Sequence, residues 1–230
     1  MIVAVIPAYN EEKTVGKIVA ETRKYADKVV VVDDSSADKT AAEAKKHGAV
    51  VIRHKKNAGL GCSLRTGLAK ALAVKGDIIL TLDADGQHDP RYIRKFVEKI
   101  NEGYDFVLGE RQLYKYPLKK KIGNFFLTHA TNFISGTNLK DTESGFRAFR
   151  RGALKKLYLK AERYEIAVEI IFEAGRNNLR AANIPIGAPP YVRGVGALDG
   201  LKNFLYLLHR RERTWRGYLQ DVKYVVRKWL

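Results

Sequence analysis

The chain alternates between short apolar runs and segments in which apolar residues recur every three or four positions. The runs are rich in Val and Ile and have the length of strands buried on both faces of a sheet. They cover residues 2–6, 29–32, 49–53, 78–82 and 106–108. The periodic segments predict helices over residues 15–25, 39–48, 61–74 and 90–101. This alternation predicts an α/β fold with a mainly parallel sheet and helices on both faces.

The second half of the chain continues this pattern with longer interruptions. Residues 122–139 and 165–174 are predicted to be helical, and residues 180–186 are predicted to form a last strand. Three prolines and four glycines between residues 185 and 200 then predict a mobile loop. A loop of this kind can close over a bound diphosphate and exclude water from it.

The polar residues that follow the strand predicted over residues 78–82 form the strongest candidate site. Asp83 and Asp85 stand where the chain leaves the sheet, and Gln87 follows. Ligands of open α/β sheets bind beyond the carboxyl ends of the strands. Two carboxylates and an amide oxygen at this spacing can hold Mg²⁺ or Mn²⁺ and leave positions for water and phosphate oxygens. The alternative is that these acids only serve a turn, as Asp89 is predicted only to cap the next helix.

Other strand ends carry groups suited to a nucleoside diphosphate. The first strand delivers an aromatic ring and an acid, the second delivers two carboxylates, and the fifth delivers a fixed cation. These residues are Pro7, Tyr9, Asn10, Glu11, Asp33, Asp34 and Arg111. Each of them alone fits a turn, cap or core residue. Because they follow several strands that end at one edge of the sheet, they favour a nucleotide site.

The composition limits the classes of protein that fit. The chain has 230 residues, 46% of them hydrophobic, which is enough for a sizeable core. A single cysteine, Cys62, excludes an internal disulfide framework and fits a reducing compartment. No signal peptide and no apolar stretch of about 20 residues is recognised, so we expect a cytoplasmic protein without a spanning helix.

The formal charge of +17 predicts an anionic partner, such as a nucleotide, an anionic membrane surface or a nucleic acid. A nucleic-acid-binding protein is the remote alternative. The basic residues are spread over several predicted helices, and no recognition motif is found. The acids at the strand ends would also repel nucleic-acid phosphates unless a metal ion intervened. We therefore expect no nucleic-acid partner.

Six motifs, taken in order, carry a resemblance to a known family. They are IPAYNEE (Ile6 to Glu12), VVVDDSS (Val30 to Ser36), NAGLG (Asn57 to Gly61), DADGQHDP (Asp83 to Pro90), GER (Gly109 to Arg111) and DTESGFRAFRR (Asp141 to Arg151). Over residues 2–196 the chain resembles the inverting glycosyltransferases of family 2, which have the GT-A fold. Within that family it is similar to the dolichyl-phosphate mannose and glucose synthases. The resemblance implies metal-dependent transfer of a hexose from GDP-mannose or UDP-glucose to a polyprenyl phosphate at the cytoplasmic face of a membrane.

The same resemblance implies roles for individual residues. The metal ion, Mg²⁺ or Mn²⁺, would be held by Asp83, Asp85 and Gln87. The nucleotide sugar would be contacted by Pro7, Tyr9, Glu11, Val32, Asp34, Asp83, Ala84, Asp85, Gln87, Arg111 and Arg193. The residues expected to act in catalysis are Asp85, Arg111 and Asp141.

The chain departs from the family pattern at one place. Leu198 and Asp199 stand where the family has a Ser-Lys pair, so the lysine that would help to clamp the diphosphate is missing. Either Arg193 acts alone, Lys202 substitutes for that lysine, or the donor differs from the usual one. Glu169 lies where the family often has an acid near the donor sugar, and the alternative for it is an acid on a helix surface.

The nature of the acceptor decides whether the reaction needs a base. An inverting displacement requires a nucleophile held in line with the leaving diphosphate. A phosphate monoester, with a second pKa of about 6, is largely ionised at neutral pH and needs no strong base. A saccharide hydroxyl does need one, and the candidates are Asp141 and Glu143. Both acceptors stay open, and Asp141 either orients the acceptor or assists as the base.

Two segments predict contact with an anionic membrane surface. Residues 111–126 hold five basic residues and no acid, and they end in Phe125 and Phe126. Such a helix fits a membrane interface, and the alternative is a helix packed on the sheet with a solvated basic end. We expect the catalytic domain to cover residues 1–200 and a basic amphipathic helical tail to cover residues 201–230. The tail suits a membrane surface, a membrane subunit or a second copy of the chain, and we expect peripheral membrane association.

Overall fold

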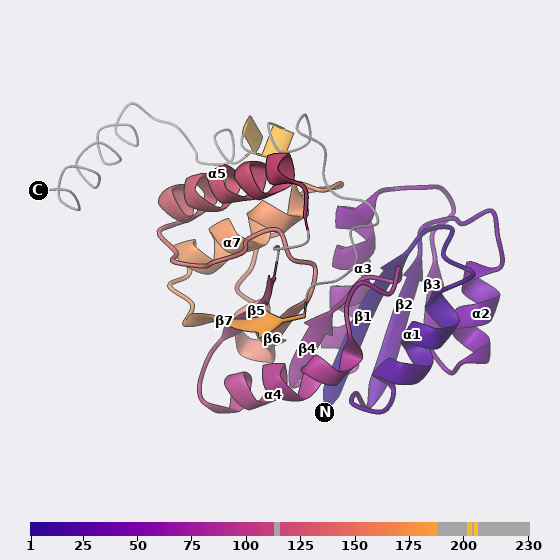
Figure 1. Ribbon diagram of the computed structural model, residues 1–230. Helices are drawn as coiled ribbons and strands as arrows, with labels where there is room; N and C mark the ends of the chain where they lie inside the picture. The colour runs from indigo at the N-terminus through magenta and orange to yellow at the C-terminus, as the bar shows by residue number, and fades with distance from the viewer. Residues whose placement is uncertain (113–115, 188–201, 204, 207–230) are drawn as a thin grey trace, which may run out of the picture.

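The computed structural model has one seven-stranded sheet at its centre (Figure 1). It describes residues 1–112, 116–187, 202–203 and 205–206. The strands are β1 (Ile2–Ala8), β2 (Lys28–Asp33), β3 (Val50–Arg53), β4 (Ile78–Thr81), β5 (Phe106–Arg111), β6 (Arg147–Arg150) and β7 (Ala181–Ile186). Their order in the sheet is β3-β2-β1-β4-β6-β5-β7, and only β6 runs antiparallel to its neighbours. The prediction of a mainly parallel sheet is confirmed.

Helices cover both faces of the sheet, as predicted. One face carries α1 (Val15–Thr22), α2 (Thr40–Lys46), the 3₁₀ turn η1 (Pro90–Tyr92) and α4 (Ile93–Asn101). The other face carries α3 (Leu60–Ala73), α6 (Arg151–Leu154) and α7 (Ile166–Arg176). A further helix, α5 (Leu118–Ser135), packs on α7 as an outer layer (Figure 1).

Strand β1 shows why the apolar runs of this sequence do not alternate with polar residues. Val3 and Val5 point into the core layer beneath α3 and α7, whereas Ala4 and Ile6 point into the layer beneath α1 and α4. Successive side chains of a strand face opposite sides of the sheet, and here both sides are covered by helices. All four side chains are therefore fully buried.

Several helix ends differ from the predicted ones. Helix α1 stops at Thr22 instead of residue 25. Helix α5 is displaced from the predicted residues 122–139, because Gly136 adopts a left-handed backbone with φ of 70° and ends it. The prediction for Asp89 is confirmed, since its side chain accepts a hydrogen bond from the backbone N–H of Arg91 at 2.9 Å.

The reversed direction of β6 decides what lies at the carboxyl edge of the sheet. Thr81 at the end of β4 pairs with Arg147 at the start of β6. The segment that precedes Arg147 therefore reaches the same edge as the loop that follows β4. A hydrogen bond from Thr81 Oγ1 to the carbonyl of Gly145, 2.8 Å long, joins the two segments.

In the part of the chain that the structure describes, no helix combines the length and the hydrophobicity that crossing a bilayer requires. The predicted loop at residues 188–200, the domain end near residue 200 and most of the tail lie outside the described residues. Those three predictions stay predictions.

Candidate active site

The loops after β1 and β2 hold each other in place. The Asn10 backbone, with φ of 55°, donates its N–H to Ser36 Oγ at 2.9 Å, and Asn10 Oδ1 accepts the N–H of Ala37 at 2.9 Å. Asp33 is fully buried, forms an ion pair with Arg53 at 3.2 Å and accepts the N–H of Ser36. Asn10 and Asp33 are therefore scaffold residues of this edge.

Asp34 anchors the loop between β3 and α3. Its carboxylate accepts the backbone N–H groups of Ala58 (2.9 Å) and Gly59 (2.8 Å), and His54 Nδ1 lies 2.7 Å from it. Burial acts to raise the pKa of Asp34, but these hydrogen bonds outweigh it and the pKa is lowered. The carboxylate is therefore charged. Because Gly59 is the only partner of Oδ2 among the described residues, this oxygen can accept another hydrogen bond, for example from a nucleobase.

The NAGLG motif requires glycine because another loop crosses over it. A side chain at Gly61 would place its Cβ 2.3 Å from the carbonyl oxygen of Ala161, and Gly59 has φ of 96°. The crossing loop is held by Glu169, which is fully buried and accepts the N–H groups of Lys160 and Ala161 at 2.9 Å. The helix-surface alternative for Glu169 is therefore wrong.

The loop after β4 presents the two predicted metal ligands. Asp85 accepts both the backbone N–H and the side-chain amide of Gln87, at 2.9 and 2.8 Å. The Asp83 side chain is 41% exposed, and its backbone N–H donates to Nδ1 of the buried His88 at 3.1 Å. A Cβ at Gly145 would lie 2.6 Å from Asp83 Oδ2, so glycine at this position leaves room for the carboxylate.

The acids at this edge of the sheet lie close enough to repel one another, and a bound cation would reduce that repulsion. Burial, and then the neighbouring Asp83, raise the pKa of Asp85. Burial also raises the pKa of Glu11, and Asp85 and Asp83 add to that effect. A divalent ion would stabilise the charged forms of Asp85 and Glu11, which burial and the neighbouring acids disfavour.

No group of three or more His, Cys, Asp or Glu side chains within the described ranges is arranged to hold a metal ion. A cation here would accordingly rest on Asp83, Asp85 and the Gln87 amide oxygen, and oxygens of water and a diphosphate would complete its coordination.

Arg111 and Asp141 form a two-pronged ion pair. Arg111 Nε lies 2.7 Å from Asp141 Oδ2, and its Nη2 lies 3.0 Å from Asp141 Oδ1. Burial alone would lower the pKa of Arg111, but the charge and hydrogen bonds of Asp141 raise it. Since Asp141 also accepts the N–H groups of Arg111 and Glu143, its oxygens are occupied. This geometry favours an orienting role for Asp141 over the role of a base.

Glu143 is the acid of this segment that is free to act as a base. Both of its carboxylate oxygens are buried, and neither has a hydrogen-bond partner among the described residues. Asn203 faces it, but no hydrogen bond of normal geometry forms. Burial, and then the charge of Asp141, raise the pKa of Glu143 to about 7. Its carboxyl group can therefore exchange a proton near neutral pH.

Arg147 and His88 belong to this site, although the sequence interpretation gave them no role. Arg147 is 2% exposed, its Nε has no partner among the described residues, and burial lowers its pKa to about 10. Burial lowers the pKa of His88, so its ring is neutral and can accept the Asp83 N–H. The signal for Arg147 was an arginine enclosed by Phe146, Ala148 and Phe149, which are all fully buried.

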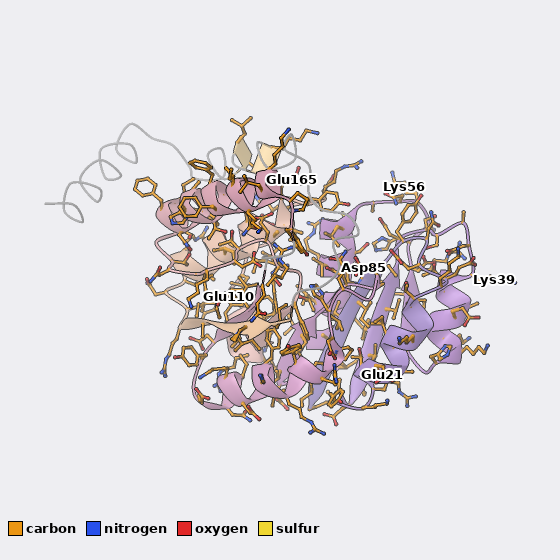
Figure 2. All side chains as sticks on the ribbon, in the orientation of Figure 1. Glu21, Lys39, Lys56, Asp85, Glu110 and Glu165 are labelled. Atoms are coloured by element: carbon orange, nitrogen blue, oxygen red, sulfur yellow. The ribbon has the colours of Figure 1, made fainter. Side chains whose placement is uncertain are left out.

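The remaining predicted contacts lie along the same edge of the sheet. Pro7 pairs with Val32 across β1 and β2, and both are buried, whereas Tyr9 beyond them is 50% exposed. Figure 2 shows Asp85 near the upper ends of the central strands, while Glu21 lies below it, toward the lower ends of the strands. Arg193 lies outside the described residues.

Comparisons with known proteins agree on one family. The family described as Glycosyl transferase family 2 matches residues 3–158. A UDP-N-acetylglucosamine–dolichyl-phosphate N-acetylglucosaminyltransferase of Methanococcus voltae is 35% identical, over 90% of this chain and 95% of the relative. A dolichyl-phosphate hexose transferase of Haloferax volcanii is 30% identical, over 84% of this chain and 83% of the relative.

A solved structure shares the fold. The glucosyl-3-phosphoglycerate synthase of Mycobacterium tuberculosis, in complex with Mn²⁺, UDP and glucosyl-3-phosphoglycerate, superposes with a TM-score of 0.72. The superposition covers 90% of this chain and 79% of that enzyme, at 20% sequence identity. This similarity supports the predicted GT-A fold.

Proposed function

The chain belongs to glycosyl transferase family 2 and is a glycosyltransferase, and we propose that it transfers a sugar from a nucleotide diphosphate to a polyprenyl phosphate of the dolichyl type. One observation carries the proposal. The acids after β4 and the Arg111–Asp141 pair reach the same edge of the sheet, because β6 runs against its neighbours. A donor and a phosphate acceptor can therefore meet above that edge.

The donor would be held by the loops after β1, β2 and β4. The exposed ring of Tyr9 offers a stacking surface for the base, and Asp34 Oδ2 offers an acceptor. Asp83, Asp85 and Gln87 would hold Mg²⁺ or Mn²⁺, which stabilises the negative charge of a departing diphosphate. Superposition on an enzyme that is known with Mn²⁺ supports this assignment.

The acceptor would be held by the segment between Asp141 and Arg147. The guanidinium of Arg147 supplies a buried positive charge with an unpaired Nε. Arg111 adds a second cation, held in place by Asp141. A phosphate monoester that arrives as a monoanion has a pKa of about 6. Glu143, whose pKa is about 7, takes that proton, and the resulting phosphate dianion attacks the sugar carbon as the diphosphate leaves.

The unpaired state of Glu143 also favours a second candidate function. A carboxylate with a pKa of about 7 is suited to accept the proton of a sugar hydroxyl at neutral pH. A glycosyltransferase with a saccharide acceptor would keep every donor contact and differ only at this step.

Helix α5 supports a membrane-bound acceptor. Its surface exposes five large apolar side chains, namely Leu118, Ile122, Phe125, Phe126 and Phe133, with exposed fractions between 46% and 70%. Lys119 lies exposed at the same end as Leu118, and the helix contains no acid. Aromatic and aliphatic side chains beside lysines are typical of helices that lie on anionic lipid. We infer that α5 rests on the membrane that contains the polyprenyl phosphate.

The test is transfer of radiolabel into organic-extractable lipid. GDP-mannose, UDP-glucose and UDP-N-acetylglucosamine are supplied separately with polyprenyl phosphate and Mn²⁺, with and without a chelator. We expect lipid-phase label from one donor that the chelator abolishes. Label that appears only in a water-soluble saccharide would support the second candidate instead.

Two variants in one loop separate the metal ligand from the helix cap. Asp85→Asn should lose at least about a hundredfold in rate, because it removes a carboxylate from the predicted metal site. Asp89→Asn is the matched control, since Asp89 caps η1 and takes no part in the proposed site. Equal activity of the two variants would contradict the assignment of Asp85.

A further inference from the structure

A basic pocket lies at the corner between the end of β3 and the start of α3. Its volume is about 470 Å³. The loop contributes His54, Lys55, Lys56 and Ala58, and the first turns of α3 contribute Cys62, Arg65 and Thr66. Figure 2 shows Lys56 on the same rim as Asp85 but away from it, above the β2–β3 side of the sheet. None of the pocket residues belongs to the metal or acceptor segments.

Within the part of the chain that the structure describes, the cations of this pocket have no acidic partners. Arg65 donates one N–H to the Cys62 sulfur at 3.1 Å, and its buried Nε has no partner among the described residues. A thiol sulfur is a weak acceptor for a guanidinium. Lys55 and Lys56 are exposed and form no ion pair within the described ranges. By contrast, the adjacent Arg53 is paired with Asp33 at 3.2 Å.

His54 connects the pocket to the donor loops. One ring nitrogen lies 2.7 Å from Asp34, and the other lies 3.0 Å from the hydroxyl of Thr66. Only 17% of the ring is exposed, so its position is fixed. A ligand in the pocket would therefore contact a histidine that holds Asp34, and Asp34 holds the loop at Ala58.

We propose that this pocket binds the phosphate group of a small soluble molecule, at a site separate from the donor diphosphate. Three cations that have no acidic partner among the described residues, one of them with a buried N–H that likewise lacks a partner there, form a site for a phosphate. A volume of about 470 Å³ exceeds the needs of a phosphate alone and fits a phosphorylated small molecule. A lipid phosphate is disfavoured, because α5 lies at the other end of the molecule from the β2–β3 side (Figure 1).

The test uses two histidines as reporters in the NMR spectrum of the full chain. His54 lines the pocket, and His88 contacts the backbone of Asp83 at the donor site. Pyrophosphate is titrated without metal, against sodium chloride at equal ionic strength. We expect a saturable shift of the His54 ring signals, which are assigned from a His54→Gln spectrum.

Substitutions then test the cations. Arg65→Gln and Lys56→Gln should each weaken the His54 response about tenfold, because each removes a charge-assisted hydrogen bond. Lys17→Gln removes an exposed charge from α1 and should leave the response unchanged. Lys56 is exposed, so its variant keeps the test valid even if Arg65→Gln impairs folding.

Three results would overturn the proposal. One is a His54 response no larger than that to chloride, and another is a response that survives both substitutions. The third is a response to phosphatidylglycerol vesicles without one to pyrophosphate, which would assign the phosphate to lipid. Under the first of these results, a shift of His88 alone would place pyrophosphate at the donor site. None of these readouts requires transferase activity, so the pocket and the proposed function can fail independently.

Discussion

Two helices with similar shares of apolar residues face the solvent in opposite ways. Helix α4 buries Ile93, Phe96 and Ile100 against the sheet and leaves its charged residues outside. Helix α5 buries hydroxyl groups, such as that of Thr131, and exposes phenylalanines, such as Phe126. Burial of apolar area stabilises a folded chain, so the α4 arrangement is explained by folding alone. The α5 arrangement is not, and it fits the proposal that this helix rests on a membrane surface.

The same contrast extends to the two parts of the chain that contain these helices. In the donor half, residues 1–111, the buried acids Asp33 and Asp34 have partners. In the acceptor half, residues 116–187, Glu143 and part of Arg147 are buried without them. Unpaired buried polar groups reduce stability and are retained at sites of function. The contrast holds for the acids Asp34 and Glu143: Asp34 has several partners, whereas Glu143 has none among the described residues.

Truncation of one phenylalanine in each helix should give the largest difference. Phe96→Ala should lower the free energy of unfolding by about 3–5 kcal/mol, because Phe96 is fully buried. Phe126→Ala should change it by less than about 0.5 kcal/mol, because 67% of Phe126 is exposed. Urea unfolding measures both values. In cosedimentation with anionic vesicles, Phe126→Ala should bind less than Phe96→Ala. Equal vesicle binding by the two variants would contradict the proposed difference between the helices.

The unpaired carboxyl of Glu143 should make stability depend on pH. Between its ordinary pKa of 4.5 and its folded value of about 7, the folded state keeps a proton that the unfolded state loses. The free energy of unfolding should therefore fall by up to about 3 kcal/mol as pH rises through this window. Glu143→Gln should remove that part of the fall. Urea unfolding from pH 5 to pH 8 tests this, and parallel curves for the two proteins would show that Glu143 does not titrate there.

Asp34 is an acid of the donor half whose charged form should stabilise the fold, in contrast to that of Glu143. Asp34→Asn should lower stability by about 1–3 kcal/mol at pH 7, because an amide cannot accept all the bonds from Ala58, Gly59 and His54. Glu98→Gln, on the exposed face of α4, is the control and should be neutral. Matching urea midpoints for these variants would mean that the Asp34 contacts contribute no net stability.

A small effect on stability is expected from a single methyl group added where the two halves meet. Gly145→Ala should displace the Asp83 carboxylate, because the added Cβ would lie 2.6 Å from its Oδ2. Stability should change by less than about 1 kcal/mol, since a side-chain end can move, while apparent metal affinity should fall about tenfold. Gly152→Ala adds the same methyl in open space and is the reference. If metal titrations of activity gave the same midpoint for both variants, Gly145 would not position Asp83.

The sequence predicted most of the donor half because its signals are local. The apolar runs, the acids at the strand ends and the Asp89 cap can each be read within a few residues. Strand β6 was not among the predicted strands, and its direction could not be read, because the short segment Arg147–Arg150 has the same pattern in a parallel or an antiparallel strand. Burial of Glu169 depends on a loop that crosses α3, and local pattern carries no information about that crossing.

For the acceptor half, the sequence predicted the helix and its aromatic residues, but not which of its sides faces outward. Both sides of α5 contain apolar residues, and the contact with α7 decides the matter. There the backbone of Ser135 approaches Gly175 so closely that a Cβ would lie 1.9 Å from the Ser135 carbonyl oxygen. Small and hydroxyl side chains allow such an approach. The phenylalanines are left on the other side.

The reversed strand β6 has a consequence for how such enzymes diversify. Strand β6 starts at the edge of the sheet where β5 ends. The segment between Arg111 and Arg147 therefore begins and ends beside the proposed donor site. An insertion, deletion or exchange within that segment would leave the order and register of the strands unchanged. Recombination at Arg111 and Arg147 would therefore exchange the segment proposed to bind the acceptor and leave the proposed nucleotide-binding residues unchanged.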